Sequence, residues 1–163
     1  MSRLDYWHPV LASADLPARS PAGIKLDGHC IAIFRAGDGQ LGAIEDKCAH
    51  RRMKLSLGCV KNGRVICPYH GWSFNRAGEG ESPSSPKLHA NVTSYDCAET
   101  AGVVWVKARG AQQDLPAFPM DGWDYVGAVF NKVRAPLPLV LDNFSEIEHT
   151  VTSGTPERAI SSR

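Results

Sequence analysis

The sequence predicts an all-β fold of short antiparallel strands, with a small subdomain of loops inserted between them. Gly and Pro predict many turns, since the 163 residues include 15 Gly and 11 Pro spread along the chain. Between these turns, β-forming residues occur in short alternating runs. The segment 48–86 departs from this pattern, because it is rich in Gly, Cys, His and Pro. We expect loops there that something other than a hydrophobic core holds together.

The overall composition predicts one core and a tail. A chain of 163 residues can bury one core of ordinary size. Hydrophobic residues make up 43% and charged residues 21%, as in soluble globular proteins. The net charge of +1 provides no field that would favour nucleic acid or an anionic membrane, so we expect neither as a partner.

The first predicted strands form a meander over residues 21–46. Two turn signals divide this run, Asp27-Gly28 and the Gly-Asp-Gly at 37–39, so three antiparallel strands are expected. Two weak strands follow inside the loop segment, near 64–66 and 72–74.

The sheet resumes with a predicted hairpin over residues 91–110. Its two strands are joined around Ala101-Gly102, and Tyr95, Val104 and Val106 can point inward from them. We expect this hairpin and the meander to form the base sheet, with the loops of about 45–85 as a subdomain inserted at one end.

The last predicted element is a short helix within residues 139–154. Asn143 and Glu146 stand three residues apart and fit a capping box. Gly154 and Pro156 would end this helix early.

Four residues carry the candidate chemistry, namely Cys48, His50, Cys67 and His70. They form two Cys-His pairs, each on a loop that contains or adjoins Gly or Pro. Such a set could hold one tetrahedral zinc ion, but the usual zinc finger groups its two cysteines in one pair and its two histidines in the other. The alternation suits a [2Fe-2S] cluster with two thiolates on one iron and two imidazoles on the other.

The remaining cysteines give a weaker signal. The chain contains five Cys, and its N-terminal residues include no apolar run of signal-peptide length. We therefore expect a cytoplasmic location, where thiols stay reduced and cysteine clusters bind metal rather than form disulfides. Cys30, Cys59 and Cys97 are expected to be small buried hydrophobic residues.

The two motifs and their flanks resemble the Rieske iron-sulfur proteins, and more closely the N-terminal part of the large subunit of Rieske non-haem iron oxygenases. C-x-H and C-x-x-H stand sixteen residues apart, in the settings CAHRRMKLSLGCV and CPYHGWSF. The stretches YWHPVLASADLP, GQLGAIEDKCAHR, SPSSP and DNFSEIEHT are similar to the same family in the same order. The resemblance implies the Rieske iron-sulfur fold and a [2Fe-2S] cluster whose ligands are Cys48, His50, Cys67 and His70.

The high-potential respiratory Rieske proteins are a poorer match. They carry two further cysteines that form a disulfide, where this chain has Met53 and Tyr69. They also place hydroxyl donors two and four residues after the last ligand, where Trp72 and Phe74 stand here. Without those donors the reduced cluster is less stabilised, so we expect a potential near the lower end of roughly −150 to +300 mV.

A second site is only partly present in DNFSEIEHT. The resemblance implies that His149 matches the first histidine of a mononuclear iron site, and that Glu146 matches a carboxylate bridging this site to the cluster histidine of a neighbouring subunit. The second iron-binding histidine should stand at position 154, which is Gly154. The facial triad cannot be completed from these residues, and a helix-surface histidine remains the alternative for His149.

The resemblance implies a Rieske [2Fe-2S] domain over residues 1–135, with the cluster-binding subdomain at about 45–85, followed by a linker and the start of a catalytic domain over 136–163. In an oxygenase shortened by truncation or a reading-frame change, this domain would accept electrons from a reductase or ferredoxin. They would serve the O₂-dependent hydroxylation or demethylation of an organic substrate, expected to be aromatic. Mononuclear Fe(II) is expected only with a complete catalytic domain, so whether this chain is itself an oxidoreductase is left open.

Two alternatives remain beside the oxygenase domain. One is a stand-alone Rieske-type ferredoxin that carries electrons to another enzyme. The other is an interaction module that a metal stabilises. The resemblance implies a homotrimeric assembly in intact oxygenases of the family.

Three cations follow the first ligand histidine in the sequence. Arg51, Arg52 and Lys54 form either a basic rim that attracts an acidic electron donor or an ordinary solvated charge run.

Overall fold

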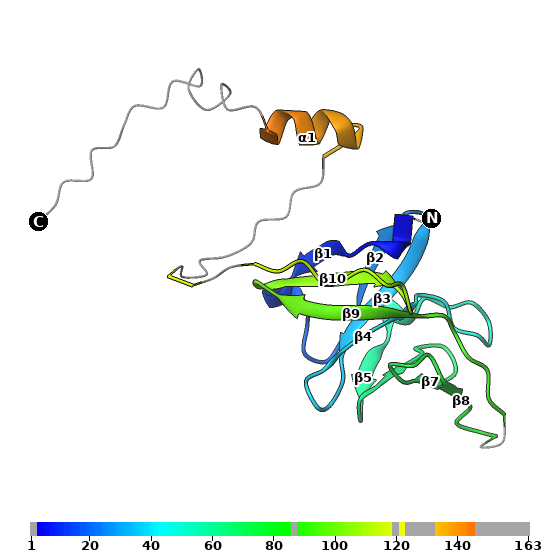
Figure 1. Ribbon diagram of the computed structural model, residues 1–163. Helices are drawn as coiled ribbons and strands as arrows, with labels where there is room; N and C mark the ends of the chain where they lie inside the picture. Colours follow the sequence, from blue (N-terminus) through cyan, green and yellow to red (C-terminus); the bar gives the residue numbers. More distant parts are fainter. Residues whose placement is uncertain (1–2, 86–87, 119–120, 123–132, 146–163) are drawn as a thin grey trace, which may run out of the picture. The chain divides into compact units, whose positions relative to one another are not determined.

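The computed structural model describes residues 3–85, 88–118, 121–122 and 133–145. The chain divides into two compact units, 1–130 and 131–163, which are described separately. In the described residues of the first unit, ten strands form two antiparallel sheets, with 3-10 helices η1 (Arg3–Asp5), η2 (Ser13–Asp15) and η3 (Leu55–Leu57) (Figure 1). The predicted all-β class is confirmed, whereas the predicted domain boundary at 135 stays a prediction.

The larger sheet is the predicted base. Its strand order is β1-β10-β9-β4-β3-β2, and every neighbouring pair is antiparallel. The meander and the hairpin are therefore confirmed, and β4 pairs with β9 to join them. Its strands are β1 (His8–Ala12), β2 (Ala22–Leu26), β3 (His29–Arg35), β4 (Leu41–Glu45), β9 (Ser94–Thr100) and β10 (Val103–Ala108).

Two-residue turns fix the register of three hairpins. Asp27-Gly28 joins β2 to β3 and Ala101-Gly102 joins β9 to β10, as predicted, with positive φ at all four residues. Asn62-Gly63 makes the same kind of turn in the smaller sheet. Positive φ at both central residues is the geometry that matches the twist of paired strands.

The base sheet separates two hydrophobic cores, and β3 contributes to both. Side chains alternate along a strand, so Ile31 and Ile33 belong to one core while Ala32 and Phe34 belong to the other. The first core also receives residues from both edge strands, including Leu11 of β1 and Ile24 of β2. The sheet therefore curves around this core. Tyr95, Val104 and Val106 are buried in it, as predicted.

The second core lies beneath the inserted subdomain. The smaller sheet has the order β5-β6-β7-β8. Its side chains Val65 and Phe74, together with Trp72 just before β7, pack with Phe34 and Ile44 of the base sheet. The expectation that something other than a hydrophobic core holds this segment is therefore wrong. Its strands are β5 (Cys59–Lys61), β6 (Arg64–Ile66), β7 (Ser73–Phe74) and β8 (Gly80–Glu81).

In the second unit, the described helix is α1 (Leu137–Ser145). It begins earlier than predicted, because the Pro136 carbonyl accepts hydrogen bonds from the backbone N–H groups of Leu139 and Val140. Asn143 therefore lies inside the helix and does not cap its start, which corrects the predicted capping box. Among the described residues, no helix is long and apolar enough to cross a membrane.

Candidate metal-cluster site

The first pair of candidate ligands lies on a loop between β4 and η3, which we call the first ligand loop, residues 48–53. The backbone N–H of Cys48 donates to the Met53 carbonyl at 2.8 Å, and the Arg52 N–H donates back to the Cys48 carbonyl at 2.8 Å. Arg52 has φ of 57°, in the left-handed region. These contacts close the loop and hold His50 at its exposed tip.

The second pair lies between β6 and β7 on the second ligand loop, residues 67–72. The Cys67 N–H donates to the Trp72 carbonyl at 2.7 Å, and the Gly71 N–H donates to the Cys67 carbonyl at 3.1 Å. Gly71 has φ of 71°. The two loops thus share one backbone closure, with a cysteine first, a left-handed residue four positions later and a closing carbonyl five positions later.

Across the two loops, metal-ligand side chains of the same kind lie together. Cys48 and Cys67 are each only 2% exposed, and their thiols are within hydrogen-bonding contact. The rings of His50 and His70 are both exposed, with centroids 4.8 Å apart. One end of the site is therefore a buried thiol pair, and the other end is an exposed imidazole pair.

This arrangement fits the chemistry of a [2Fe-2S] cluster with one sulfur-ligated and one nitrogen-ligated iron. Within the described part of the chain, no three His, Cys, Asp or Glu side chains converge as a group that could hold a single metal ion. Two pairs of donors, rather than one tetrahedral set, are present. Cys48 and Cys67 would take one iron, and His50 and His70 the other.

Burial raises the pKa of the Cys48 thiol above its ordinary value, and the neighbouring Cys67 raises it further. Backbone N–H groups of His50 and Arg51 act in the opposite direction, because they stabilise the thiolate. The loop therefore points backbone dipoles at a sulfur that is too buried to ionise readily in the absence of a cation.

Aromatic rings pack against both imidazoles. The buried Trp72 stacks on His50 at 5.7 Å between centroids, and the exposed Tyr69 stacks on His70 at 3.8 Å. Phe74 stacks in turn on Trp72 at 6.4 Å. Trp72 and Phe74, identified in the sequence as replacements for hydroxyl donors, are thus core residues that support the loops from below.

A pair of side-chain hydrogen bonds at the base of the first ligand loop was not predicted from the sequence. Both carboxylate oxygens of the buried Asp46 accept hydrogen bonds from Ser56, one from its backbone N–H at 2.6 Å and one from its hydroxyl at 2.7 Å. Gly23 on β2 leaves room for this contact, since a Cβ there would lie 2.7 Å from the Ser56 hydroxyl. We call the pair Asp46 and Ser56 the clamp.

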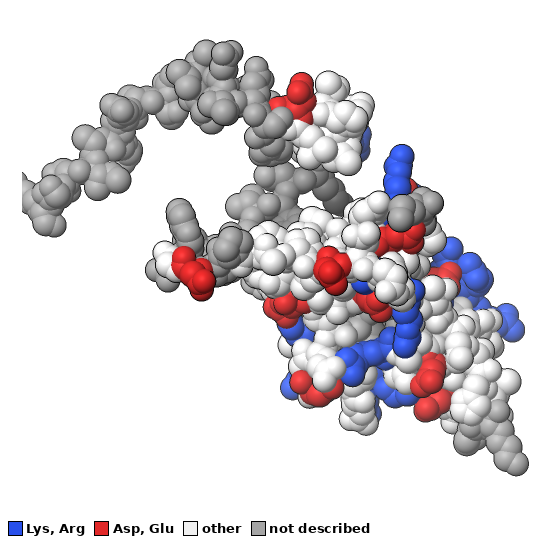
Figure 2. Space-filling model, viewed as in Figure 1, with Lys and Arg blue, Asp and Glu red and all other residues white. Residues whose placement is uncertain are grey.

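Lys and Arg side chains gather near the first ligand loop. Figure 2 shows blue atoms at the right-hand edge of the face drawn, over the loop that follows β4 in Figure 1. On and just after this loop, Arg51, Arg52 and Lys54 are all exposed. The nearest acidic contact is loose, since Arg52 lies 3.9 Å from Glu45.

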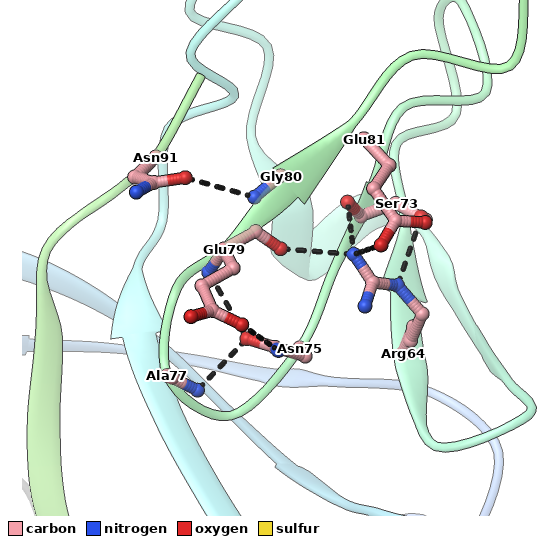
Figure 3. A network of polar contacts seen from close by, with 8 residues as sticks. All are labelled: Arg64, Ser73, Asn75, Ala77, Glu79, Gly80, Glu81 and Asn91. Carbon is pink, nitrogen blue, oxygen red and sulfur yellow. Dashed lines mark hydrogen bonds and ion pairs between the residues drawn. The ribbon is translucent and has the colours of Figure 1, made fainter. Parts of the chain in front are cut away.

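A polar network braces the strands that flank the second ligand loop (Figure 3). Arg64 of β6 donates from Nε to the Ser73 hydroxyl at 2.9 Å, and from a terminal nitrogen to the Ser73 and Glu79 carbonyls. The same side chain lies 3.3 Å from the Glu81 carboxylate. Arg64 therefore ties together β6, β7 and β8, the strands on either side of the second ligand loop and the next one along the sheet.

Asn75 closes the turn after β7 in the same network. Its side-chain oxygen accepts hydrogen bonds from the N–H groups of Ala77 and Glu79, both at 3.0 Å. Its amide nitrogen donates to the Glu79 carboxylate at 2.6 Å, and the Gly80 N–H donates to Asn91 at 3.3 Å. The smaller sheet is thus held by side chains as well as by its short ladders.

The two ligand-bearing segments meet closely at Gly58. A Cβ on Gly58 would collide with the backbone carbonyl of Ile66, the residue that precedes Cys67. Because the obstacle is backbone, a side chain here would push β5 and β6 apart. Gly58 is another site residue that the spacing of the ligands did not indicate.

The remaining cysteines are less buried than predicted. Cys59 is exposed, which contradicts its expected burial, and Cys30 and Cys97 are half-buried. Burial raises the pKa of Cys97 to about 12, so this thiol stays protonated. Glu146 and His149, predicted for the second iron site, lie outside the described residues together with position 154.

A protein-family comparison agrees with this geometry. The model described as Rieske [2Fe-2S] domain matches residues 6–113, which include both ligand loops and the whole base sheet. Its match ends before α1.

Curated relatives include proteins named as oxygenases. Chlorophyllide a oxygenase from Oryza sativa subsp. japonica, a chloroplastic protein, is 32% identical over 149 residues, covering 89% of this chain and 28% of the relative. Methylxanthine N1-demethylase NdmA from Pseudomonas putida is 36% identical over 112 residues, covering 61% of this chain and 32% of the relative. The chain thus spans about a third or less of these relatives.

Solved structures show the same fold. NdmA of Pseudomonas putida CBB5 superposes with a TM-score of 0.66 at 32% identity, covering 72% of this chain and 39% of that structure. Dicamba monooxygenase with non-heme iron and dicamba superposes with a TM-score of 0.63 at 28% identity, covering 69% and 37%.

Proposed function

Because the chain belongs to the Rieske [2Fe-2S] domain family, we propose that it carries single electrons as the Rieske domain of a terminal oxygenase. Cys48, His50, Cys67 and His70 hold the cluster in this proposal. A bound cluster of this type supplies one-electron transfer, at potentials of roughly −150 to +300 mV. The electrons come from a reductase or ferredoxin and serve O₂-dependent hydroxylation or demethylation of an organic, aromatic substrate.

The observation that carries the proposal is that the two loops pair a thiol with a thiol and an imidazole with an imidazole. Cys48 contacts Cys67 in the interior, and His50 faces His70 at the surface. The two imidazoles therefore form the part of the site that a redox partner can approach. The two thiols are shielded from solvent, which protects them from oxidation.

The residues around the site support a potential in the lower part of the range. Trp72 and Phe74 occupy the positions two and four residues after His70, and both are buried and stacked. Neither side chain carries a hydroxyl that could donate a hydrogen bond toward a reduced centre. With fewer hydrogen-bond donors around the cluster, the negative charge added on reduction is less stabilised, and the reduction potential is lower.

The oxygenase context rests on the relatives. The match with chlorophyllide a oxygenase covers 149 residues, more than the 6–113 of the family model, so similarity to an oxygenase reaches beyond the Rieske region. A lone electron carrier needs no such extension. In this context Glu146 would bridge to a neighbouring subunit and His149 would bind mononuclear iron, within a homotrimer in the cytoplasm.

The test is cluster binding by the purified chain. We expect a brown-red protein with a Rieske-type electron paramagnetic resonance signal after dithionite reduction, and near-complete loss of both in Cys48→Ser. Cys59→Ser is the matched control, because Cys59 is an exposed thiol close in sequence. A colourless parent with one equivalent of zinc, or equal losses in the two variants, would contradict the proposal.

A further inference from the structure

The charges of the chain are unevenly divided between the segment that bears the ligands and the rest. Residues 47–78 contain seven Lys and Arg and no Asp or Glu, whereas the other residues contain eleven Lys and Arg and seventeen Asp and Glu. The net charge of +1 thus combines a segment at +7 with a remainder at −6. The small net charge of the chain therefore does not describe the electrostatic field near the ligand-bearing segment, which is positive.

Some cations of this segment serve the fold. Arg64 is bound to the Ser73 hydroxyl and lies 3.3 Å from Glu81. Arg76 lies 3.7 Å from Asp38 and also donates a hydrogen bond to Gln40. Their charge is largely offset by these neighbours, so they contribute little to a docking surface.

Three cations on the first ligand loop and just beyond it have no such role. Arg51 and Lys54 have no acidic partner among the described residues, and Arg52 remains 69% exposed despite its 3.9 Å contact with Glu45. We call Arg51, Arg52 and Lys54 the basic rim. All three lie within four residues of His50 in the sequence, on or just after the first ligand loop.

The surface near the basic rim is suited to close contact with a protein. The ring of Tyr69 is 55% exposed while it stacks on His70, and Leu57 is 66% exposed. Exposed aromatic side chains such as that of Tyr69 are enriched in protein interfaces, together with Arg. The exposed imidazoles of His50 and His70 lie within this same surface.

We propose that the basic rim is the docking surface for an electron-donor protein whose own redox centre is surrounded by acidic residues. The inference rests on the proposed function and adds the charge of the partner and the residues that receive it. Complementary charge would steer the donor toward the ligand loops and raise association rates roughly 10- to 1,000-fold. A long polyanion such as DNA fits less well, because the other residues of the chain carry a net charge of −6.

The experiment compares two charge-reversed triples of the full chain. The rim variant carries Arg51→Glu, Arg52→Glu and Lys54→Glu, and the control carries Arg3→Glu, Arg19→Glu and Lys25→Glu, which are exposed cations elsewhere that change the net charge equally. The probe is an oxidised plant-type [2Fe-2S] ferredoxin of low isoelectric point. Its Kd is measured by titration at low and high salt, and its reduced form is used for stopped-flow electron transfer.

We expect the rim variant to weaken binding and slow electron transfer on the order of tenfold or more at low salt, with the difference shrinking at high salt. The control should change far less, and excess dithionite should fully reduce both proteins. Equal effects in the two triples would overturn the proposal, as would tighter binding of duplex DNA than of ferredoxin by the parent.

A neutral triple guards against a folding defect. If the Glu variant loses its colour, Arg51→Gln, Arg52→Gln and Lys54→Gln should show a smaller loss of affinity in the same direction, and no loss would overturn the proposal. A colourless parent chain would instead contradict the proposed function itself. The two failures are therefore distinguishable.

Discussion

The two ligand loops have the same backbone closure but different supports. Each begins with a cysteine whose N–H and carbonyl are both bonded within the loop, and each contains one left-handed residue, Arg52 in the first and Gly71 in the second. The first loop is held by the clamp of Asp46 and Ser56. The second is held by its flanking strands and by Arg64, through several weaker contacts.

This difference shows that the shared loop shape comes from backbone hydrogen bonds, while anchoring is local to each loop. The histidine stands two residues after the cysteine in the first loop and three residues after it in the second. That offset accompanies the facing arrangement of His50 and His70. Support for the first loop is concentrated in one buried carboxylate, so the two loops should respond unequally to single substitutions.

The largest effect is expected from Asp46→Ala. Its loss leaves the Ser56 N–H and hydroxyl without their partner at a part-buried site, which should cost about 2 to 3 kcal/mol of unfolding free energy. Urea unfolding of the cluster-free chain measures this cost, and bleaching of the visible absorbance measures cluster retention.

Ser56→Ala is the matched control for the clamp, because it removes the hydroxyl and keeps the backbone bond to Asp46. We expect about half the loss. If the two variants were equally stable, the buried carboxylate would not be the anchor of the first ligand loop.

A smaller effect is expected from Gly71→Ala in the second loop. A Cβ there meets only Pro83 at 3.5 Å, an ordinary contact, so strain from the φ of 71° should dominate. We expect a loss of about 1 to 2 kcal/mol in the same urea titration.

The reciprocal change, Arg52→Gly, tests whether the two left-handed positions are equivalent. Relief of strain at φ of 57° is largely offset by the greater freedom of glycine in the unfolded chain. Stability should stay level or rise slightly. Marked destabilisation by Arg52→Gly would show that the side chain, rather than the backbone, shapes the first loop.

The smallest destabilisation is expected from Arg64→Met, which removes the hydrogen bonds and the ion pair of Arg64 and keeps an extended apolar side chain. Its hydrogen bonds are partly exposed and its ion pair with Glu81 is solvated, so we expect a loss of about 1 kcal/mol. The same urea titration checks it. A loss as large as that of Asp46→Ala would erase the contrast between the two loops.

The sequence was informative where the signal is local. Alternation of side chains and two-residue turns such as Asp27-Gly28 predicted five strands of the base sheet, and ligand spacing predicted the two donor pairs. β1 was missed because it contains Pro9, which cannot donate a ladder hydrogen bond and stands at an irregularity in the pairing with β10.

Other features depend on contacts between distant residues, so no local pattern reports them. The clamp joins residues ten positions apart across a loop, and the brace of Arg64 depends on the register of three strands. The predicted burial of Cys59 was wrong for a related reason. It lies on β5, the edge strand of the smaller sheet, where a side chain can remain in solvent.

Because β3 lies between two cores, the ligand loops cannot be moved to another protein by themselves. Phe34 packs beneath these loops, while its neighbour Ile33 packs on the opposite side of the base sheet. Residues 45–85 moved alone to a new scaffold would leave behind Phe34 and Ile44, which belong to the same hydrophobic core as Trp72. The smallest module that could be exchanged between proteins therefore includes β3 and β4.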